Sequence, residues 1–259
     1  MASNHYDKAP IVEALVDLHV APRPGLTAID LAVNLEPLLL DTYADRQEIA
    51  DPQPKLQVTI GSNGQPSVSV GVGLSGFRYT SHDKRRLLFC RLTSFTLSIQ
   101  CDPTSVESRY DRWEVLRDEA YRLWAIYKKA CEPLLVTRAA VRYINRFDLP
   151  STRVELQDYF KLYPHEPQGL KYNDIHHFVV QTQMRQPDIE ATAILNQATV
   201  PPVSPDMLSV LLDIDLFREQ LNWEASRDDM IWDYVEKLHA RENEIFEACI
   251  TDKAREVIR

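Results

Sequence analysis

The chain begins with a clear alternation of apolar and polar positions. In residues 11–20 every even position is apolar, whereas Glu13, Asp17 and His19 occupy odd positions. A period of two predicts a β-strand with one buried face and one polar face. Asn63-Gly64 is a strong signal for a hairpin turn between two further alternating segments. In the first half of the chain, such alternations predict strands at 56–60, 68–72, 87–92 and 95–101.

Two long amphipathic helices are predicted from apolar residues spaced three and four positions apart. In the first half this stripe runs from Val106 to Cys131, and the segment Asp102-Pro103-Thr104 predicts its start. In the second half Ser226, with Asp229 three residues later, predicts the cap of a final helix. Shorter helical segments are expected at 27–37, with a kink or restart at Pro37, at 154–160, and at 251–259 as a charged end that projects beyond the domain.

The second half repeats the order of elements found in the first. It begins with a strand at 135–148 and continues with strands at 175–184, 189–199 and 207–217. Each half therefore contains a strand, a helix, several antiparallel strands and a long helix, which predicts a structural duplication. The repeats are expected at 1–133 and 134–259, within one compact unit.

The predicted fold class is α+β, with a continuous curved antiparallel sheet and helices packed on one face. This outline is shared by the TATA-binding-protein fold and by helix-grip folds. Because unrelated functions occur on one architecture, the analogy concerns shape and implies no activity.

Composition narrows the classes of partner. The 259 residues include 29 Lys and Arg against 38 Asp and Glu, a formal net charge of −9, which makes nucleic-acid binding an unfavoured interpretation. The four cysteines lack the CxxC spacing of a zinc clip and are predicted to be buried free thiols, as in a reducing compartment. No leader-like segment and no apolar run of about 20 residues is present, so a cytoplasmic protein without membrane association is expected.

The main candidate site is a row of arginines. Arg138, Arg142 and Arg146 share one parity along their predicted strand, and Glu13 and Asp17 share one parity on the equivalent strand of the first half. If the two strands are neighbours, these side chains form either a charge ladder that holds the halves together or a cradle for an anion or an acidic peptide. Both interpretations stay open from the sequence, with the ladder favoured.

Signals for catalysis are weak. Asp213 and Asp215 lie two apart on a predicted strand, as a metal site or an acid/base pair would, but an exposed strand edge is the favoured interpretation. The segment Gly71–Gly76 has the letters of GxGxxG, yet a strand and not a helix is predicted after it, so a bent strand is favoured over a dinucleotide site. No catalytic residue, metal or cofactor is predicted.

Three stretches carry a resemblance to a known family: Tyr6–Val16 (YDKAPIVEALV), Val141–Phe147 (VRYINRF) and Phe246–Glu256 (FEACITDKARE). In order and spacing they resemble a sporadically distributed prokaryotic protein family of about 250 residues with no assigned function. The resemblance implies no catalytic residues. A patchy distribution is typical of mobile or defence-associated genes.

Two functions are therefore predicted. The first is a non-enzymatic protein-interaction or regulatory subunit of a defence or toxin–antitoxin type system, with a protein partner and a possible homodimer, since acidic charge steers association with basic partners. The alternative is a small-ligand sensor for an anion or nucleotide, using a cavity between sheet and helices that Arg142 or Arg146 would reach.

Overall fold

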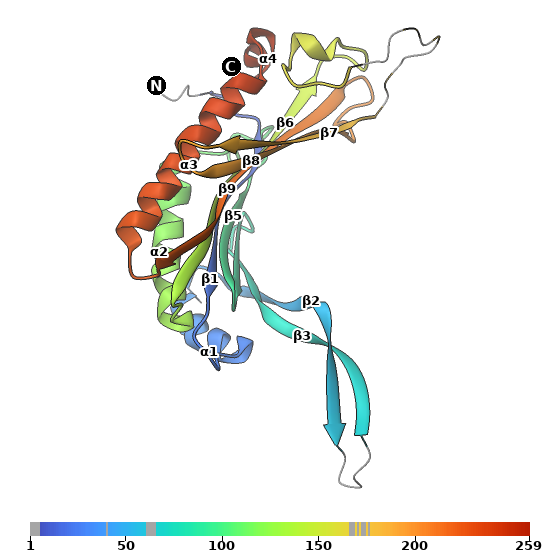
Figure 1. The fold of residues 1–259 in the computed structure, drawn as a ribbon. Helices are drawn as coiled ribbons and strands as arrows, with labels where there is room; N and C mark the ends of the chain where they lie inside the picture. Colours follow the sequence, from blue (N-terminus) through green and yellow to red (C-terminus); the bar gives the residue numbers. More distant parts are fainter. Residues whose placement is uncertain are drawn as a thin grey trace.

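The strands form one nine-stranded antiparallel sheet that is not closed, in the order β2-β3-β4-β5-β1-β6-β9-β8-β7 (Figure 1). In this computed structural model residues 6–39, 41–60, 66–165, 169, 171, 175 and 177–259 are described, and for 51–60 and 66–72 the backbone alone. The strands are β1 (Ile11–Ala21), β2 (Asp45–Ile60), β3 (Pro66–Thr80), β4 (Arg86–Arg91), β5 (Ser94–Gln100), β6 (Leu135–Leu149), β7 (Val179–Gln186), β8 (Ala191–Val200) and β9 (Leu208–Glu224).

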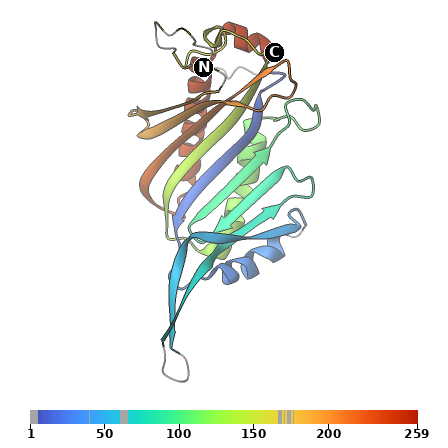
Figure 2. The ribbon, with the colours of Figure 1, turned by 90° about the vertical axis from the view of Figure 1, so that its right-hand side faces the viewer.

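The helices cover one face of this sheet. They are α1 (Ala28–Leu39), α2 (Trp113–Cys131), α3 (Asp228–Cys249) and the short α4 (Asp252–Val257), with a 3-10 turn η1 at Leu156–Asp158. Figures 1 and 2 show α1, α2 and α3 on the same side of the sheet, while the β2–β3 hairpin extends toward the other side. At the opposite edge the end of β7 lies against α3, where Arg241 donates to Gln186 at 2.8 Å. The predicted α+β fold, with an antiparallel sheet and one helical layer, is confirmed.

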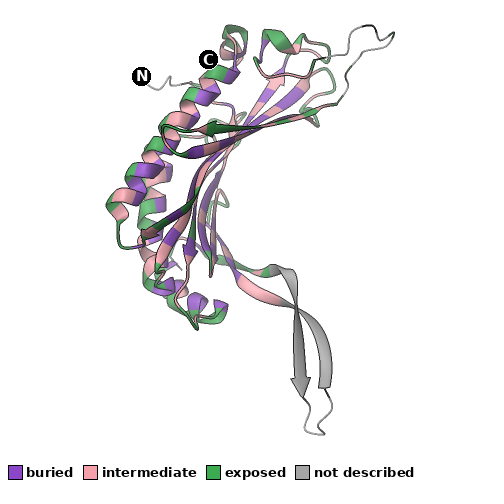
Figure 3. Ribbon diagram, viewed as in Figure 1, coloured by how far each residue is buried: buried purple, intermediate pink, exposed green. Residues whose placement is uncertain are grey.

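The core lies between the sheet and the helices. On β1 the side chains of Ala14, Val16 and Leu18 are fully buried, and the alternation of buried and less buried residues follows the predicted parity (Figure 3). Against them pack the aromatic rings of Phe95 on β5 and Trp124 on α2, whose centroids are 5.6 Å apart. The apolar alternation of the strands and the apolar stripe of α2 thus meet in one interface.

β1 and β6 lie side by side at the centre of the sheet, with antiparallel register from Ile11 opposite Asn145 to Ala21 opposite Leu135. β5 lies beyond β1 and precedes α2, and β9 lies beyond β6 and precedes α3. The two strands that carry the candidate charges are therefore direct neighbours. The Asn63-Gly64 turn lies outside the described residues, but β2 and β3, on either side of it, pair antiparallel.

The predicted start of the first long helix is wrong. α2 begins at Trp113, and residues 102–112 form turns, with Val106 80% exposed. The Arg85 guanidinium donates to the carbonyl oxygens of Glu107, Ser108 and Arg109 at 3.0, 3.0 and 2.9 Å. These carbonyls would accept the N–H groups of the first turn if the helix began earlier, so a distant arginine replaces a turn of helix.

The predictions for the second long helix and the tail also need correction. Ser226 does not cap α3, because its hydroxyl donates to Glu224 and the N-cap residue is Arg227. The tail does not project: Ile250 is extended, and α4 follows with Ala254 buried. The side-chain oxygen of Thr251 accepts the Ala254 N–H, which explains why a second helix begins there.

The strand after the GxGxxG letters is confirmed, since β3 continues to Thr80. A Cβ atom added at Gly76 would lie 2.3 Å from the Cys90 carbonyl oxygen of β4. Gly76 therefore permits a close approach of two strands and not of a phosphate. Among the thiols, Cys90, Cys131 and Cys249 are buried and free as predicted, whereas Cys101 is half-buried.

Candidate functional site

The sheet face turned away from the helices carries most of the candidate residues, and we call it the open face. Its polar side chains come from β5, β1, β6, β9 and β8, where residues of one parity alternate with the buried core. The open face includes Glu13, Asp17, His19, Thr96, Ser98, Arg138, Arg142, Arg146, Asp148, Ile194, Asn196, Ser209, Asp213 and Asp215.

Arg138 of β6 pairs with Asp17 of β1, as expected if these strands were neighbours. A second, longer contact of 3.5 Å joins Arg138 to Asp215 of β9. Burial alone would raise the pKa of Asp17, but hydrogen bonds from His19 and Thr96 and the charge of Arg138 lower it below its usual range. Asp17 is therefore a fixed carboxylate at the centre of the face.

Arg142 has a different partner from the one its strand position indicates. Its neighbour in register on β9 is Asp215, but its guanidinium reaches diagonally to Asp213 with two hydrogen bonds of 2.7 Å. Asn196 of β8 donates to the same carboxylate at 3.0 Å. Asp213 therefore accepts hydrogen bonds from both neighbouring strands, β6 and β8. The hydrogen bonds that Arg142 donates to Asp213 raise the pKa of the Arg142 guanidinium.

Arg146 is held at the end of the row. It donates to Asp148 at 3.0 Å, to the Ser209 hydroxyl at 3.1 Å and to the carbonyl of Pro201 at 2.9 Å. Glu13 accepts a 2.6 Å hydrogen bond from Ser98 and forms no ion pair with the arginine row among the described contacts. Each of the three arginines therefore has a carboxylate partner, and of these pairs Arg138–Asp17 joins the first half of the chain to the second.

The charges of β1, β6 and β9 on the open face do not cancel. Six carboxylates (Glu13, Asp17, Asp148, Asp213, Asp215 and Glu219) lie on this face with three guanidiniums, which leaves three negative charges when His19 is neutral. Burial raises the pKa of Asp215, and the neighbouring carboxylates of Asp213 and Asp17 raise it further, against the lowering effect of Arg138 and Arg142. The centre of the open face is therefore suited to a cation more than to an anion.

Asp213 and Asp215 do not lie at an exposed strand edge, since β9 is between β6 and β8. Asp213 is occupied by Arg142 and Asn196. Within the described part of the chain, no group of three or more His, Cys, Asp or Glu side chains is arranged to hold a metal ion.

Buried polar groups that were not predicted from the sequence lie between the helix-facing side of the sheet and α3. The hydroxyls of Tyr110 and Tyr143 are 3.0 Å apart, and Tyr143 lies 3.3 Å from His239. Burial lowers the pKa of His239 to about 4 and raises that of Glu242 to about 8. Glu242 lies four residues after Leu238 on the apolar stripe of α3, so a carboxylate on a buried stripe was the signal that the sequence offered.

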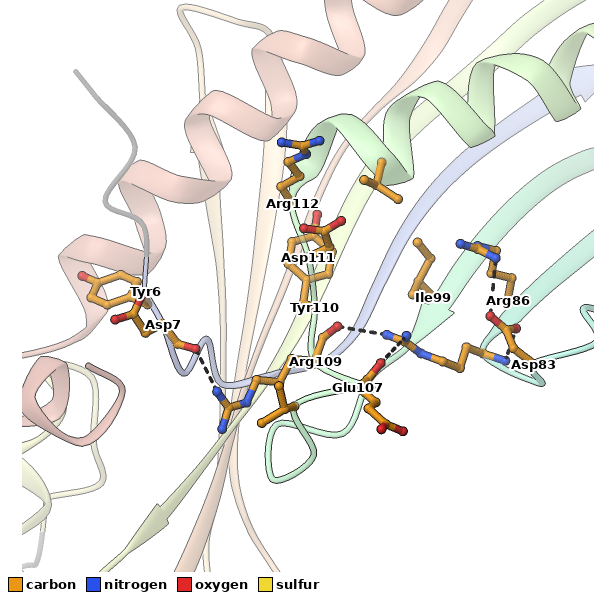
Figure 4. Close-up of a pocket in the computed structure, with 13 residues that line it drawn as sticks. Tyr6, Asp7, Asp83, Arg86, Ile99, Glu107, Arg109, Tyr110, Asp111 and Arg112 are labelled. Carbon is orange, nitrogen blue, oxygen red and sulfur yellow. Dashed lines mark hydrogen bonds and ion pairs between the residues drawn. The ribbon is translucent and has the colours of Figure 1, made fainter.

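A cavity of about 400 Å³ opens where β4, β5 and the segment before α2 meet (Figure 4). Four arginines line it, together with four carboxylates, so the formal charges of its walls cancel. Arg109 donates to the carbonyls of Pro103 and Asp7, which fixes the loop and the N-terminal segment. We assign Arg85 and Arg109 a structural role. The residues lining the cavity are Tyr6, Asp7, Asp83, Arg85, Arg86, Ile99, Val106, Glu107, Arg109, Tyr110, Asp111, Arg112 and Val115.

Comparisons with known proteins give no relative. No protein-family model matches the chain, and neither a curated protein nor a solved structure was found to match it. Among the described helices, none is long and apolar enough to cross a membrane.

Proposed function

We propose that this protein is an interaction or regulatory subunit that docks a basic protein partner on the open face of its sheet. The observation that carries the proposal is the concave sheet face with a net negative centre, which no described helix covers. Nine strands present one face to the helices, and the β2–β3 hairpin at one end and the upper ends of β6 and β9 at the other extend toward the opposite side (Figure 1). A concave acidic surface attracts and orients a cationic partner.

The charge network supports this role because it is already ordered. Arg138, Arg142 and their carboxylate partners are held by hydrogen bonds within the chain, so binding would not have to order them. A preorganised surface loses less conformational entropy when a partner docks. Half-buried apolar side chains such as Leu15 and Ile194 lie between the charged rows and add contact area.

The test compares two identical substitutions on opposite sides of the molecule. Ile194→Lys places a cation opposite Asp215 on the open face, whereas Ile29→Lys changes an α1 residue that is 65% exposed. Partners are captured from the native host with the wild type and with each variant. We expect Ile194→Lys to lose the partner and Ile29→Lys to retain it. Equal capture by all three proteins, or equal loss in both variants, would overturn the proposal.

We propose a defence or toxin–antitoxin type system in the cytoplasm as the setting, from the resemblance to a sporadically distributed family. We also propose that 1–133 and 134–259 are duplicated modules with a TATA-binding-protein-like or helix-grip-like outline. The matching positions of β5–α2 and β9–α3 on either side of β1 and β6 support the duplication. Superposition of one half on the other in an experimental structure tests it; unrelated paths of α2 and α3 would refute it.

The alternative, a sensor of an anion or nucleotide, stays a prediction. Arg142 and Arg146 contact carboxylates and line no described cavity. Thermal-shift screening with nucleotides tests this function, because a bound ligand stabilises the folded state in proportion to its occupancy.

A further inference from the structure

The two edges of the sheet differ in how they are protected. β2, at one edge, contains Pro52 and Pro54 and has register shifts against β3. Proline donates no ladder hydrogen bond, and irregular register discourages the addition of a strand. β2 is therefore a protected edge.

β7, at the other edge, has none of these features. It pairs with β8 in unbroken register from Val179 to Gln186, and its sequence VVQTQMRQ contains no proline, no glycine, no lysine and no carboxylate. Val179 is 77% exposed and Met184 39% exposed. No described strand lies beyond it. A regular, nearly uncharged edge strand rich in β-forming residues is a template for another strand.

We propose that β7 pairs antiparallel with β7 of a second copy of this chain, about a two-fold axis at Thr182, so that two sheets join into one. This inference does not rest on the proposed function. A two-fold antiparallel pairing is self-complementary, because each strand offers the other the same hydrogen-bonding edge.

The register about Thr182 is argued from the side chains that it brings together. It places Gln181 opposite Gln183 on the open face and Val180 opposite Met184 on the helix face, as the alternation of β7 requires. Arg185, the only charge of the strand, lies opposite Val179 and not opposite itself. Polarity matches at the Gln181–Gln183 and Val180–Met184 pairs, and no like charges meet.

The contact is expected to be reversible. An eight-residue strand offers about six to eight backbone hydrogen bonds and a small buried area, which is typical of micromolar association. Each chain carries a net charge of −9, so higher salt screens the repulsion between copies and strengthens the dimer. Binding of a basic partner to the open face responds to salt in the opposite direction, so the two proposals fail independently.

The experiment is a charge swap at the two-fold axis, measured by sedimentation equilibrium on the full chain without any partner. Thr182→Glu and Thr182→Lys each place like charges opposite one another, and we expect each to weaken dimerisation by at least about tenfold. An equimolar mixture of the two restores dimers, because opposite charges then meet. The matched controls Thr192→Glu and Thr192→Lys, on β8, keep the wild-type dissociation constant. Circular dichroism checks the fold of each variant.

Three results would overturn the inference. The first is a wild type that stays monomeric at several hundred micromolar protein in high salt. The second is a Thr182 variant that dimerises as well as the wild type. The third is a mixture of the two Thr182 variants that does not recover, since any other interface or register leaves the charges apart.

Discussion

The two aspartates of β9 predict opposite responses to the same substitution. Asp213 receives two hydrogen bonds of 2.7 Å from Arg142 and one of 3.0 Å from Asn196. Asp215 lies two residues later on the same face, and among its described contacts the 3.5 Å pair with Arg138 is the one ion pair. Replacing each by asparagine removes one negative charge and leaves the shape of the side chain nearly unchanged. We expect Asp213→Asn to destabilise the fold and Asp215→Asn to leave it unchanged or to stabilise it.

The magnitude follows from burial and pairing. The Asp213 side chain is 11% exposed but Arg142 is 38% exposed, so the pair is intermediate between a surface pair and a buried one. Surface pairs contribute about 0–1 kcal/mol and broken buried pairs cost about 3–5, which gives about 2 kcal/mol for Asp213→Asn. In a chain of this size that lowers Tm by about 5 °C. For Asp215→Asn the expected change is within about 0.5 kcal/mol or favourable, since burial makes the ionised form costly.

The assay is urea unfolding at pH 7, repeated at lower pH. Burial raises the pKa of Asp215 in the folded state above the unfolded value of 3.8. The wild type is therefore most stable relative to Asp215→Asn below pH 3.8, and it loses that advantage as pH rises through the folded pKa. Equal destabilisation by both substitutions, or a larger effect at Asp215, would refute the assignment of the network.

Two further predictions concern groups away from the open face. Burial raises the pKa of Glu242 from 4.5 to about 8, so its contribution to the free energy of unfolding is complete below pH 4.5 and is lost as pH rises through about 8. Between pH 4.5 and 7 we expect the wild type to lose about 3 kcal/mol or less of stability relative to Glu242→Gln. Parallel profiles of stability against pH for the two proteins would contradict this prediction. Arg85→Ala frees three backbone carbonyls in the segment before α2, and we expect amide hydrogen exchange in that segment to become at least about tenfold faster. Arg86→Ala is the control, because it loses one 3.4 Å ion pair and is expected to leave the exchange rate unchanged. Equal exchange rates in both variants would show that Arg85 does not order this segment.

The alternation of apolar and polar residues was sufficient to predict much of the fold. The alternation around Glu13 and Asp17 correctly predicted which face of β1 is buried, because burial has the same period as the strand. The shared parity of Arg138, Arg142 and Arg146 placed them on one face for the same reason. The carboxylate partners of these arginines were not predictable from the sequence. Arg142 binds Asp213 and not Asp215 because of the register of β6 against β9 and because its side chain extends diagonally to the neighbouring strand.

Two of the failed predictions have a common physical cause, which is a contact between residues distant in sequence. The helical stripe from Val106 was plausible by periodicity, but Arg85 takes the carbonyls that its first turn would need. The C-terminal segment looked like a free charged end, but Ile250 bridges to Phe160 and Ile258 accepts the Lys8 N–H. Local sequence cannot report such partners, because they depend on the packing of the whole chain.

The affinity of the captured partner for the wild type, Ile194→Lys and Ile29→Lys, at low and at physiological salt, tests the central claim most directly. Docking on the acidic open face predicts a dissociation constant at least about tenfold higher for Ile194→Lys, an unchanged value for Ile29→Lys, and weaker binding of the wild type as salt rises. An Ile194→Lys variant that binds as tightly as the wild type at both salt concentrations would contradict it.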